Sequence, residues 1–184
     1  MDAGALQRLV DEADCRALLM RYGPAVDWRD RAALETLFWP DATIDLGVFK
    51  GSGAEAPDFL ITGASLRRLH ITTSVSLRLD GDGGEAESCA ITHAITGGPE
   101  VGMASHLYLG RYLDLLERRA GEWRIASRLY VLHGQVSDAY LESPALAAMT
   151  KADSLSSGRP LPSPTRREGM LSPEPSPTPI QEAR

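Results

Sequence analysis

The sequence contains few cysteines, and this scarcity excludes one class of fold. Its 184 residues include only Cys15 and Cys89, too few for the disulfide framework of a small secreted domain. Both lie in apolar-patterned segments, which is typical of buried thiols in a reducing cytoplasm. The first residues, MDAGALQRLVDEAD, include acids and no apolar core, so we expect no secretory signal. These features predict a cytoplasmic protein.

The sequence also lacks a long apolar run and an excess of basic residues. No stretch approaches the ~20 apolar residues that span a bilayer. With 19 basic and 25 acidic residues the net charge is −6, whereas nucleic-acid binding needs clustered Lys and Arg. No HExxH or comparable metal motif occurs. We therefore expect no nucleic acid, no membrane, no metal and no cofactor.

Proline and aromatic residues are unevenly distributed, and they mark a boundary near residue 150. Residues 152–184 contain seven of the twelve prolines and no aromatic residue. Such a segment buries too little apolar surface to offset the entropy lost on ordering. The sequence predicts one domain over residues 1–150, large enough for a sizeable core, and a disordered Pro/Ser-rich tail over residues 151–184.

Helical patterns open the predicted domain. Residues 5–22 place apolar side chains along one stripe at helical spacing, namely Leu6, Leu9, Val10, Ala13, Ala17 and Met20. Pro24 is expected to perturb this helix near its end. Asp30 is expected to cap a short second helix over residues 31–38, and a third helix is predicted over residues 55–68.

Strand patterns follow the helices. A short β-rich segment covers residues 42–51, and four longer candidates cover residues 70–80, 85–96, 106–119 and 122–136. Turn sequences separate the four longer segments, which predicts an antiparallel meander. Helices followed by an antiparallel sheet indicate an α+β fold, with the helices packed on one face of a curved sheet. A strongly curved sheet that is closed by helices has the shape of a cone. The open end of this cone is expected to form an apolar pocket with a few polar groups.

Strand alternation predicts which polar side chains enter this pocket. The residues expected to share a face with His70 are Thr72, Ser74 and Ser76. Those expected to share a face with His93 are Cys89, Ile91 and Ile95. Those expected to share a face with Arg128 are Arg124, Tyr130 and Leu132. A single β-bulge would invert any of these assignments.

Three segments, residues 21–47, 66–87 and 109–128, resemble the SnoaL-like branch of the nuclear-transport-factor-2-like (NTF2-like) superfamily. The first helix, the PDA turn, the short strand and the histidine-led strand occur in that family's order, and the resemblance spans residues 5–137. It implies an α+β cone, in which a curved antiparallel or mixed sheet packs against N-terminal helices around an apolar pocket. It also implies a homodimer or homotrimer.

Four positions carry a comparison with enzymes of that superfamily. Tyr22 and Asp27 match the spacing of a tyrosine and an aspartate at the end of the first helix of bile acid 7α-dehydratase. His70 matches the histidine that pairs with this aspartate in scytalone dehydratase and in hexachlorocyclohexane dehydrochlorinase. Arg128 matches an arginine after the last-strand tryptophan of the dehydrochlorinase, which has a lysine where Tyr22 stands.

The resemblance implies removal of a proton next to a leaving group. A neutral His70 imidazole would be the base, and Asp27 would fix its tautomer and stabilise the imidazolium. Tyr22 would donate a hydrogen bond to a substrate carbonyl or to the departing hydroxyl, and Arg128 would stabilise developing negative charge. The expected substrate-binding residues are Trp28, Phe49 and His93.

Each candidate also has a structural interpretation. Asp27 could cap the helix end or face solvent, and His93 could be a satisfied core histidine or a second donor in the pocket. His70 could be a structural residue at a strand start. Arg128 could pair with a surface acid, and Tyr22 could pack in the core with its hydroxyl at the surface. Side chains five residues apart on an ideal helix point about 140° apart. Tyr22 and Asp27 would then reach one pocket only if the helix bends or ends there, which Pro24 allows.

These features predict a cofactor-independent lyase or isomerase. Within that class, the preferred prediction is a dehydratase that acts on a hydrophobic cyclic small molecule. A polyketide cyclase and an epoxide-opening enzyme are alternatives. The latter calls for an aspartate–arginine–aspartate set, and the sequence shows no convincing second acid on the final strands. A non-catalytic small-molecule-binding domain and an accessory subunit of a ring-hydroxylating oxygenase are the alternatives from other classes.

Overall fold

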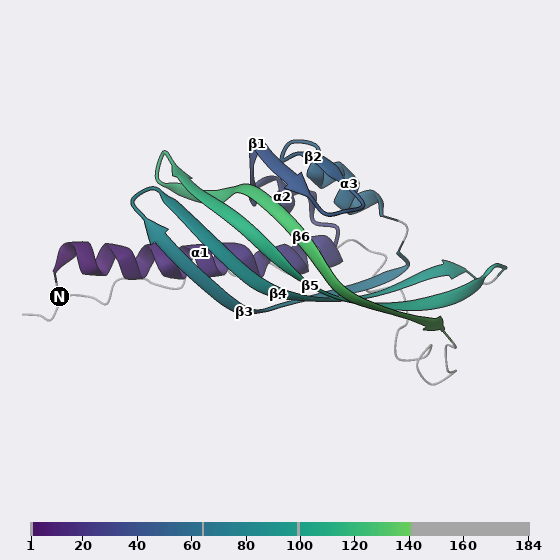
Figure 1. Ribbon diagram of the computed structural model, residues 1–184. Helices are drawn as coiled ribbons and strands as arrows, with labels where there is room; N and C mark the ends of the chain where they lie inside the picture. The colour runs from purple at the N-terminus through teal and green to yellow at the C-terminus, as the bar shows by residue number, and fades with distance from the viewer. Residues whose placement is uncertain (1, 64, 99, 141–184) are drawn as a thin grey trace, which may run out of the picture.

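The computed structural model describes residues 2–63, 65–98 and 100–140, and it shows an α+β fold (Figure 1). Three helices, in chain order, are α1 (Ala3–Asp27), α2 (Arg31–Glu35) and α3 (Ala56–Thr62). The strands are β1 (Phe38–Asp45), β2 (Lys50–Ser52), β3 (Arg67–Asp80), β4 (Gly83–Gly98), β5 (Gly102–Arg119) and β6 (Glu122–Ala139). The predicted tail, residues 151–184, lies outside the described residues.

The six strands form one curved, unclosed mixed sheet in the order β2-β1-β6-β5-β4-β3. Strand β1 pairs with β6 in parallel, and the other neighbouring strands pair antiparallel. Figure 1 shows α1 lying along the sheet and the end of the β4–β5 hairpin extending well beyond the helices. The predicted α+β class and the antiparallel meander of the last four strands are confirmed.

Helix α1 differs from its prediction in length. Asp2 caps its N-terminus by accepting from the backbone N–H of Gly4 at 2.9 Å. The helix continues through Pro24 to Asp27, so Pro24 does not end it. Proline removes one backbone donor and costs the helix stability, but the packing of the last turn against the sheet outweighs this local effect.

The buried face of α1 is also not the predicted one. Four members of the predicted stripe are 44–54% exposed, namely Leu6, Leu9, Val10 and Met20. The buried residues are Asp11, Cys15, Leu18, Leu19, Tyr22, Gly23, Ala25 and Val26. The prediction was wrong because the helix carries apolar residues on more than one side, and periodicity alone does not decide which side meets the sheet.

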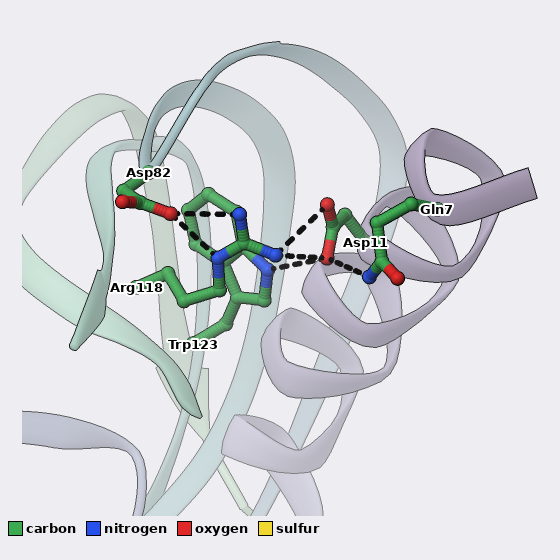
Figure 2. A network of polar contacts seen from close by, with 5 residues as sticks. All are labelled: Gln7, Asp11, Asp82, Arg118 and Trp123. Atoms are coloured by element: carbon green, nitrogen blue, oxygen red, sulfur yellow. Dashed lines mark hydrogen bonds and ion pairs between the residues drawn. The ribbon is translucent and has the colours of Figure 1, made fainter. Parts of the chain in front are cut away.

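A polar network joins the first half of α1 to the end of the sheet that carries the β3–β4 and β5–β6 turns (Figure 2). The Asp11 carboxylate accepts from Arg118 of β5 at 2.9 Å and from the Trp123 indole of β6 at 3.1 Å. Gln7 donates to the same carboxylate at 3.1 Å, and Arg118 also pairs with Asp82 in the β3–β4 turn at 2.7 Å. Charge-assisted bonds of this kind satisfy a buried carboxylate and fix the helix direction.

Strand β3 begins earlier than the sequence predicts. The helix predicted over residues 55–68 ends at Thr62 with Gly63 as its C-cap. The Leu66 N–H then donates to the Ile95 oxygen at 2.7 Å, and Arg67 and Arg68 pair with β4. Pairing with β4 overrides the local helical preference of this segment, and it turns Arg68 into a sheet residue.

A bulge in β3 inverts the predicted strand faces. Thr73 pairs with Cys89 and Ser76 pairs with Glu87, so β3 has one extra residue between these pairs. Ser74 has a positive φ of 53° at this point. The assignment of Ser76 to the face of His70 is therefore wrong. After the bulge the half-buried positions are those of Val75, Leu77 and Leu79.

Candidate functional site

A cavity of about 490 Å³ opens between the helices and the inner face of the sheet. Its lining is largely apolar and aromatic, with contributions from α1, the β1–β2 loop, α3 and the strands β3 to β6. The polar or aromatic residues that matter for its chemistry are Tyr22, Arg68, His70, Tyr108, Tyr112 and Tyr130. An apolar cavity with a few convergent polar groups is the usual form of a small-molecule site.

Asp27 and His70 are in direct contact beside this cavity. Asp27 Oδ1 lies 2.6 Å from His70 Nδ1, and Asp27 Oδ2 accepts from the His70 backbone N–H at 2.9 Å. The two side chains are 12% and 14% exposed. Because an ionised carboxylate has only acceptors, we assign the proton to Nδ1. The neutral imidazole then carries its lone pair on Nε2.

Gly23 allows this contact. A Cβ atom at this position would lie 2.8 Å from the backbone oxygen of His70 and 3.2 Å from its Cβ. The absence of a side chain lets α1 approach β3 closely. Asp27 lies four residues on, above Gly23 on the same side of the helix. It therefore meets β3 while the neighbouring side, with Tyr22 and Val26, faces the cavity.

Tyr22 is buried in the wall of the cavity. Its ring is edge-on to the His70 ring at 6.0 Å and to the Tyr112 ring at 5.3 Å. Burial raises the pKa of Tyr22, and the nearby Arg128 charge opposes that shift only in part. Tyr22 therefore stays protonated at neutral pH and keeps a hydrogen-bond donor.

Arg128 lies beneath the cavity wall and is not among the residues that line it. Its guanidinium carbon lies over the rings of both Tyr22 and Tyr112, at 4.3 and 4.2 Å from their centroids. Nε and Nη2 donate to the two carboxylate oxygens of Asp114 at 2.7 and 2.8 Å, and both side chains are fully buried. Burial and Asp114 therefore act in opposite directions on the pKa of Arg128, and the net effect is an increase.

The structure shows an acid on the final strands, Asp114, which is buried against Arg128 and is not among the residues that line the cavity. Asp114 lies on β5 opposite Arg128 of β6. In the sequence it is a lone acid among apolar residues, in the segment YLDLL, and this pattern was the available signal for a buried acid. The Nη1 atom of Arg128 is buried and has no hydrogen-bond partner within the described part of the chain. The predicted role of Arg128 in stabilising negative charge stays a prediction, and Nη1 is the nitrogen not engaged by Asp114.

The structure does not place the three expected substrate-binding residues at the cavity wall. Trp28 caps the C-terminus of α1, where its backbone N–H donates to the backbone oxygen of Pro24 at 3.0 Å. Phe49 stacks on the cavity residue Phe59 at 4.7 Å. His93 lies on the outer face of β4, where Nε2 is 2.8 Å from the Ser105 hydroxyl.

Sequence reasoning missed Gly23 and Arg68 as site residues, and it also missed the two tyrosines of β5 that line the cavity. It did place Tyr130 of β6 on the predicted face of Arg128. Tyr108 and Tyr112 lie on the same face of β5, and both line the cavity together with Tyr130 of β6. Their period-2 spacing was a usable signal. Arg68 was hidden by its assignment to a helix, and Gly23 carries no side chain to attract attention.

Within residues 2–63, 65–98 and 100–140, no group of three or more His, Cys, Asp or Glu side chains is arranged to hold a metal ion. No helix in that same part of the chain is long and apolar enough to cross a membrane.

Several solved structures share this fold at low sequence identity. A type 2 hexachlorocyclohexane dehydrochlorinase is 20% identical with a TM-score of 0.66, over 76% of this chain and 98% of the other. A protein proposed to be a scytalone dehydratase, from Novosphingobium aromaticivorans, is 16% identical with a TM-score of 0.60, over 74% and 91%. A protein of unknown function from Mycobacterium tuberculosis is 18% identical with a TM-score of 0.59, over 84% and 87%.

These structural matches establish the fold and leave the activity open. A search of curated protein sequences found no match. A sequence profile of the SnoaL-like domain matches residues 7–129, more than half of the chain. The fold and the profile agree with the predicted resemblance, and the chain belongs to the SnoaL-like family.

Proposed function

We propose that this chain is a cofactor-independent lyase of the dehydratase type, acting on a hydrophobic cyclic small molecule. His70 is its base and Asp27 positions that base. The observation that carries the proposal is that one carboxylate binds both the ring Nδ1 and the backbone N–H of His70 beside a largely apolar cavity. A histidine held only for packing would not need both contacts.

The proton movements follow from this arrangement. With Nδ1–H donated to Asp27, the Nε2 lone pair removes a proton from a carbon next to a carbonyl. The electron pair of that C–H bond forms an enolate. Collapse of the enolate breaks the C–O bond at the neighbouring carbon, and the departing hydroxyl takes the proton from the His70 imidazolium, leaves as water and regenerates the neutral base. The Asp27 carboxylate stabilises the imidazolium formed in the first step. A positioned base of this kind contributes about 10²–10⁴-fold in rate.

Tyr22 supplies the donor next to the base. Its raised pKa keeps the hydroxyl protonated, and it lines the cavity together with His70. It would donate to the substrate carbonyl or to the departing hydroxyl. Arg128, stacked on the Tyr22 ring, acts in this proposal through the local electrostatic potential, since Asp114 holds its Nε and Nη2 atoms.

The test is a comparison of His70→Ala, Asp27→Asn and the control His133→Ala, which removes an exposed histidine of β6. The substrates are cyclic β-hydroxy ketones, and the readout is the ultraviolet absorbance of the enone product. Loss of turnover of about 10²-fold or more is expected for the first two variants, with folding and ligand affinity retained. If His70→Ala turns over like the control, the dyad has no catalytic role and the small-molecule-binding domain becomes the better proposal.

The same enolate chemistry would serve a polyketide cyclase. This alternative therefore uses His70 and Asp27 in the same roles. An epoxide-opening enzyme gains no support from Asp114. That acid is fully buried against Arg128 and does not line the cavity. A pair of acids placed to activate water and protonate an epoxide would have to reach the cavity.

We also propose a homodimer or homotrimer that uses the outer face of the sheet. Alternate residues of β5 point away from the cavity, and the exposed leucines among them are Leu107, Leu109, Leu113 and Leu115. Leu129 and Val136 extend this surface on β6. A contiguous exposed apolar surface of this kind is typical of an interface.

A further inference from the structure

One hydrogen-bonding edge of Arg68 has no partner among the residues that the structure describes. Its side chain lines the cavity, and its Nε and Nη2 atoms are buried without any hydrogen bond to the described residues. Arginine is effectively always protonated in proteins. Burying guanidinium N–H groups without acceptors is costly, and their occurrence in a cavity wall therefore calls for a ligand group that accepts from them.

Arg128 shows in the same protein what this edge can bind. There Nε and Nη2 donate to the two oxygens of the Asp114 carboxylate at 2.7 and 2.8 Å. In Arg68 the same two atoms are the buried ones that have no partner over residues 2–63, 65–98 and 100–140. The side-on edge formed by Nε and Nη2 matches the two oxygens of a carboxylate in geometry and charge.

The surroundings of Arg68 provide positive charge in excess. The acid that interacts with it electrostatically is Asp27, but both oxygens of that carboxylate already accept from His70. Arg29 adds a second positive charge that, after burial, also lowers the pKa of Arg68. A negatively charged ligand group would relieve this repulsion, whereas a neutral one would leave it in place.

Arg68 and His70 lie on one face of β3, two residues apart. They pair in register with Ala94 and Thr92 of β4, and all four residues line the cavity. Residues at this spacing have Cα atoms about 7 Å apart. A group bound to Arg68 would therefore place a carbon a few bonds away beside the His70 ring.

We propose that the ligand of this cavity is an apolar molecule that carries a carboxylate, and that Arg68 binds this carboxylate through Nε and Nη2. The inference deepens the proposed function, because the position it gives to the reactive carbon rests on His70 being the base. Arg68 is the residue that selects the acid over its neutral analogues.

The test measures binding, and it requires no turnover. Isothermal titration compares 2-naphthoate with the neutral 2-naphthamide, an isosteric pair of bicyclic probes. The proteins are the wild type, Arg68→Gln, Arg68→Lys and the control Arg78→Gln, which removes the same charge from an exposed position on β3. Wild type and control should bind the acid at least about tenfold more tightly than the amide. Arg68→Gln should lose this preference, and Arg68→Lys should keep part of it.

Three results would overturn the proposal. They are equal affinity of the wild type for acid and amide, an undiminished preference in folded Arg68→Gln, and no binding of 2-naphthoate to the wild type. If Arg68→Gln fails to fold, Gly63→Ala replaces it, since a Cβ there would lie 3.2 Å from Arg68 Nη1 and should weaken acid binding selectively.

A His70→Gln variant separates this inference from the proposed function. It should retain the preference for the acid, because Arg68 is intact. Inactivity of the wild type towards cyclic β-hydroxy ketones both with and without a carboxylate, together with a retained acid preference, would end the dehydratase proposal and leave this one standing. The reverse combination would remove Arg68 as the selecting residue and leave the His70 chemistry in place.

Discussion

Gly23 of α1 packs directly against the backbone of His70 in β3, with room for no side chain between them. A Cβ atom at Gly23 would meet backbone, which cannot rotate away as a side chain can. The close approach of α1 to β3 at this point brings the Asp27 carboxylate to both His70 donors. The geometry of the Asp27–His70 pair therefore depends on a residue that has no side chain.

Replacing Gly23 with alanine is predicted to separate this pair. Overpacking of this kind typically costs about 1–3 kcal/mol in stability, and the displaced β3 should also reduce turnover of any substrate found. Chemical denaturation and kcat/KM measure the two effects. The control is Gly4→Ala on the same helix, where a Cβ would meet nothing closer than 3.6 Å. If Gly23→Ala were as stable and active as the Gly4 variant, the close packing would not matter to the site.

The Asp11 network in Figure 2 predicts a defined dependence of stability on pH. Burial raises the pKa of Asp11, but hydrogen bonds from Trp123 and Gln7 and the charge of Arg118 outweigh it, so the net pKa is lowered. A lowered folded pKa contributes stability above the ordinary aspartate value of about 3.9. This contribution is lost as the pH falls through the folded pKa.

Asp11→Asn should remove that pH-dependent contribution, and it should lower the free energy of unfolding by about 1–3 kcal/mol at neutral pH because Arg118 and Trp123 lose a charged acceptor. Urea unfolding between pH 3 and pH 7 measures it. The wild-type and Asp11→Asn curves should converge towards low pH. Parallel curves across this range would show that Asp11 does not couple folding to protonation.

The buried pair of Arg128 and Asp114 is predicted to behave non-additively. Asp114→Leu alone leaves a fully buried guanidinium without its counter-charge, and Arg128→Met alone leaves the carboxylate unpaired. Removing one partner of such a pair typically costs about 3–5 kcal/mol. The double variant Asp114→Leu, Arg128→Met should cost less than the sum of the single changes, as measured in a double-mutant cycle by denaturation. Additive losses would mean that the two side chains stabilise the fold independently.

The outer face of the sheet is predicted to be the subunit interface. Leu113→Glu would place a charge at the centre of the exposed leucines of β5, and it should shift the protein from an oligomer to a monomer in light scattering. Leu9→Glu makes the same change on the exposed apolar side of α1, and it should leave the oligomer intact. A monomer from Leu9→Glu alone would move the interface to α1, and a monomeric wild type would exclude both.

The features that the sequence predicts correctly are local ones, and the features that it misses depend on tertiary contacts. The strand-forming segments and their turns were predictable because alternation and turn residues are local signals. The faces of β3 and α1 were not. In β3 the bulge at Ser74 shifts the register by one residue, and a one-residue shift moves every later side chain to the other face. In α1 two apolar sides competed, and contact with the sheet selected the one that includes Cys15 and Tyr22.

By itself the sequence determined the α+β order, the turns of the meander and the spacing of Tyr22, Asp27 and His70, because these depend on neighbouring residues and on the residues that carry the family resemblance. Only the tertiary structure decided how these residues meet. The close approach at Gly23 joins Asp27 to His70, Asp114 takes the charge of Arg128, and β4 draws Arg68 into the cavity wall. Asp27 and His70 are 43 residues apart in the sequence, and Asp114 and Arg128 are 14 apart. Such contacts arise from packing in three dimensions, which a local pattern does not encode.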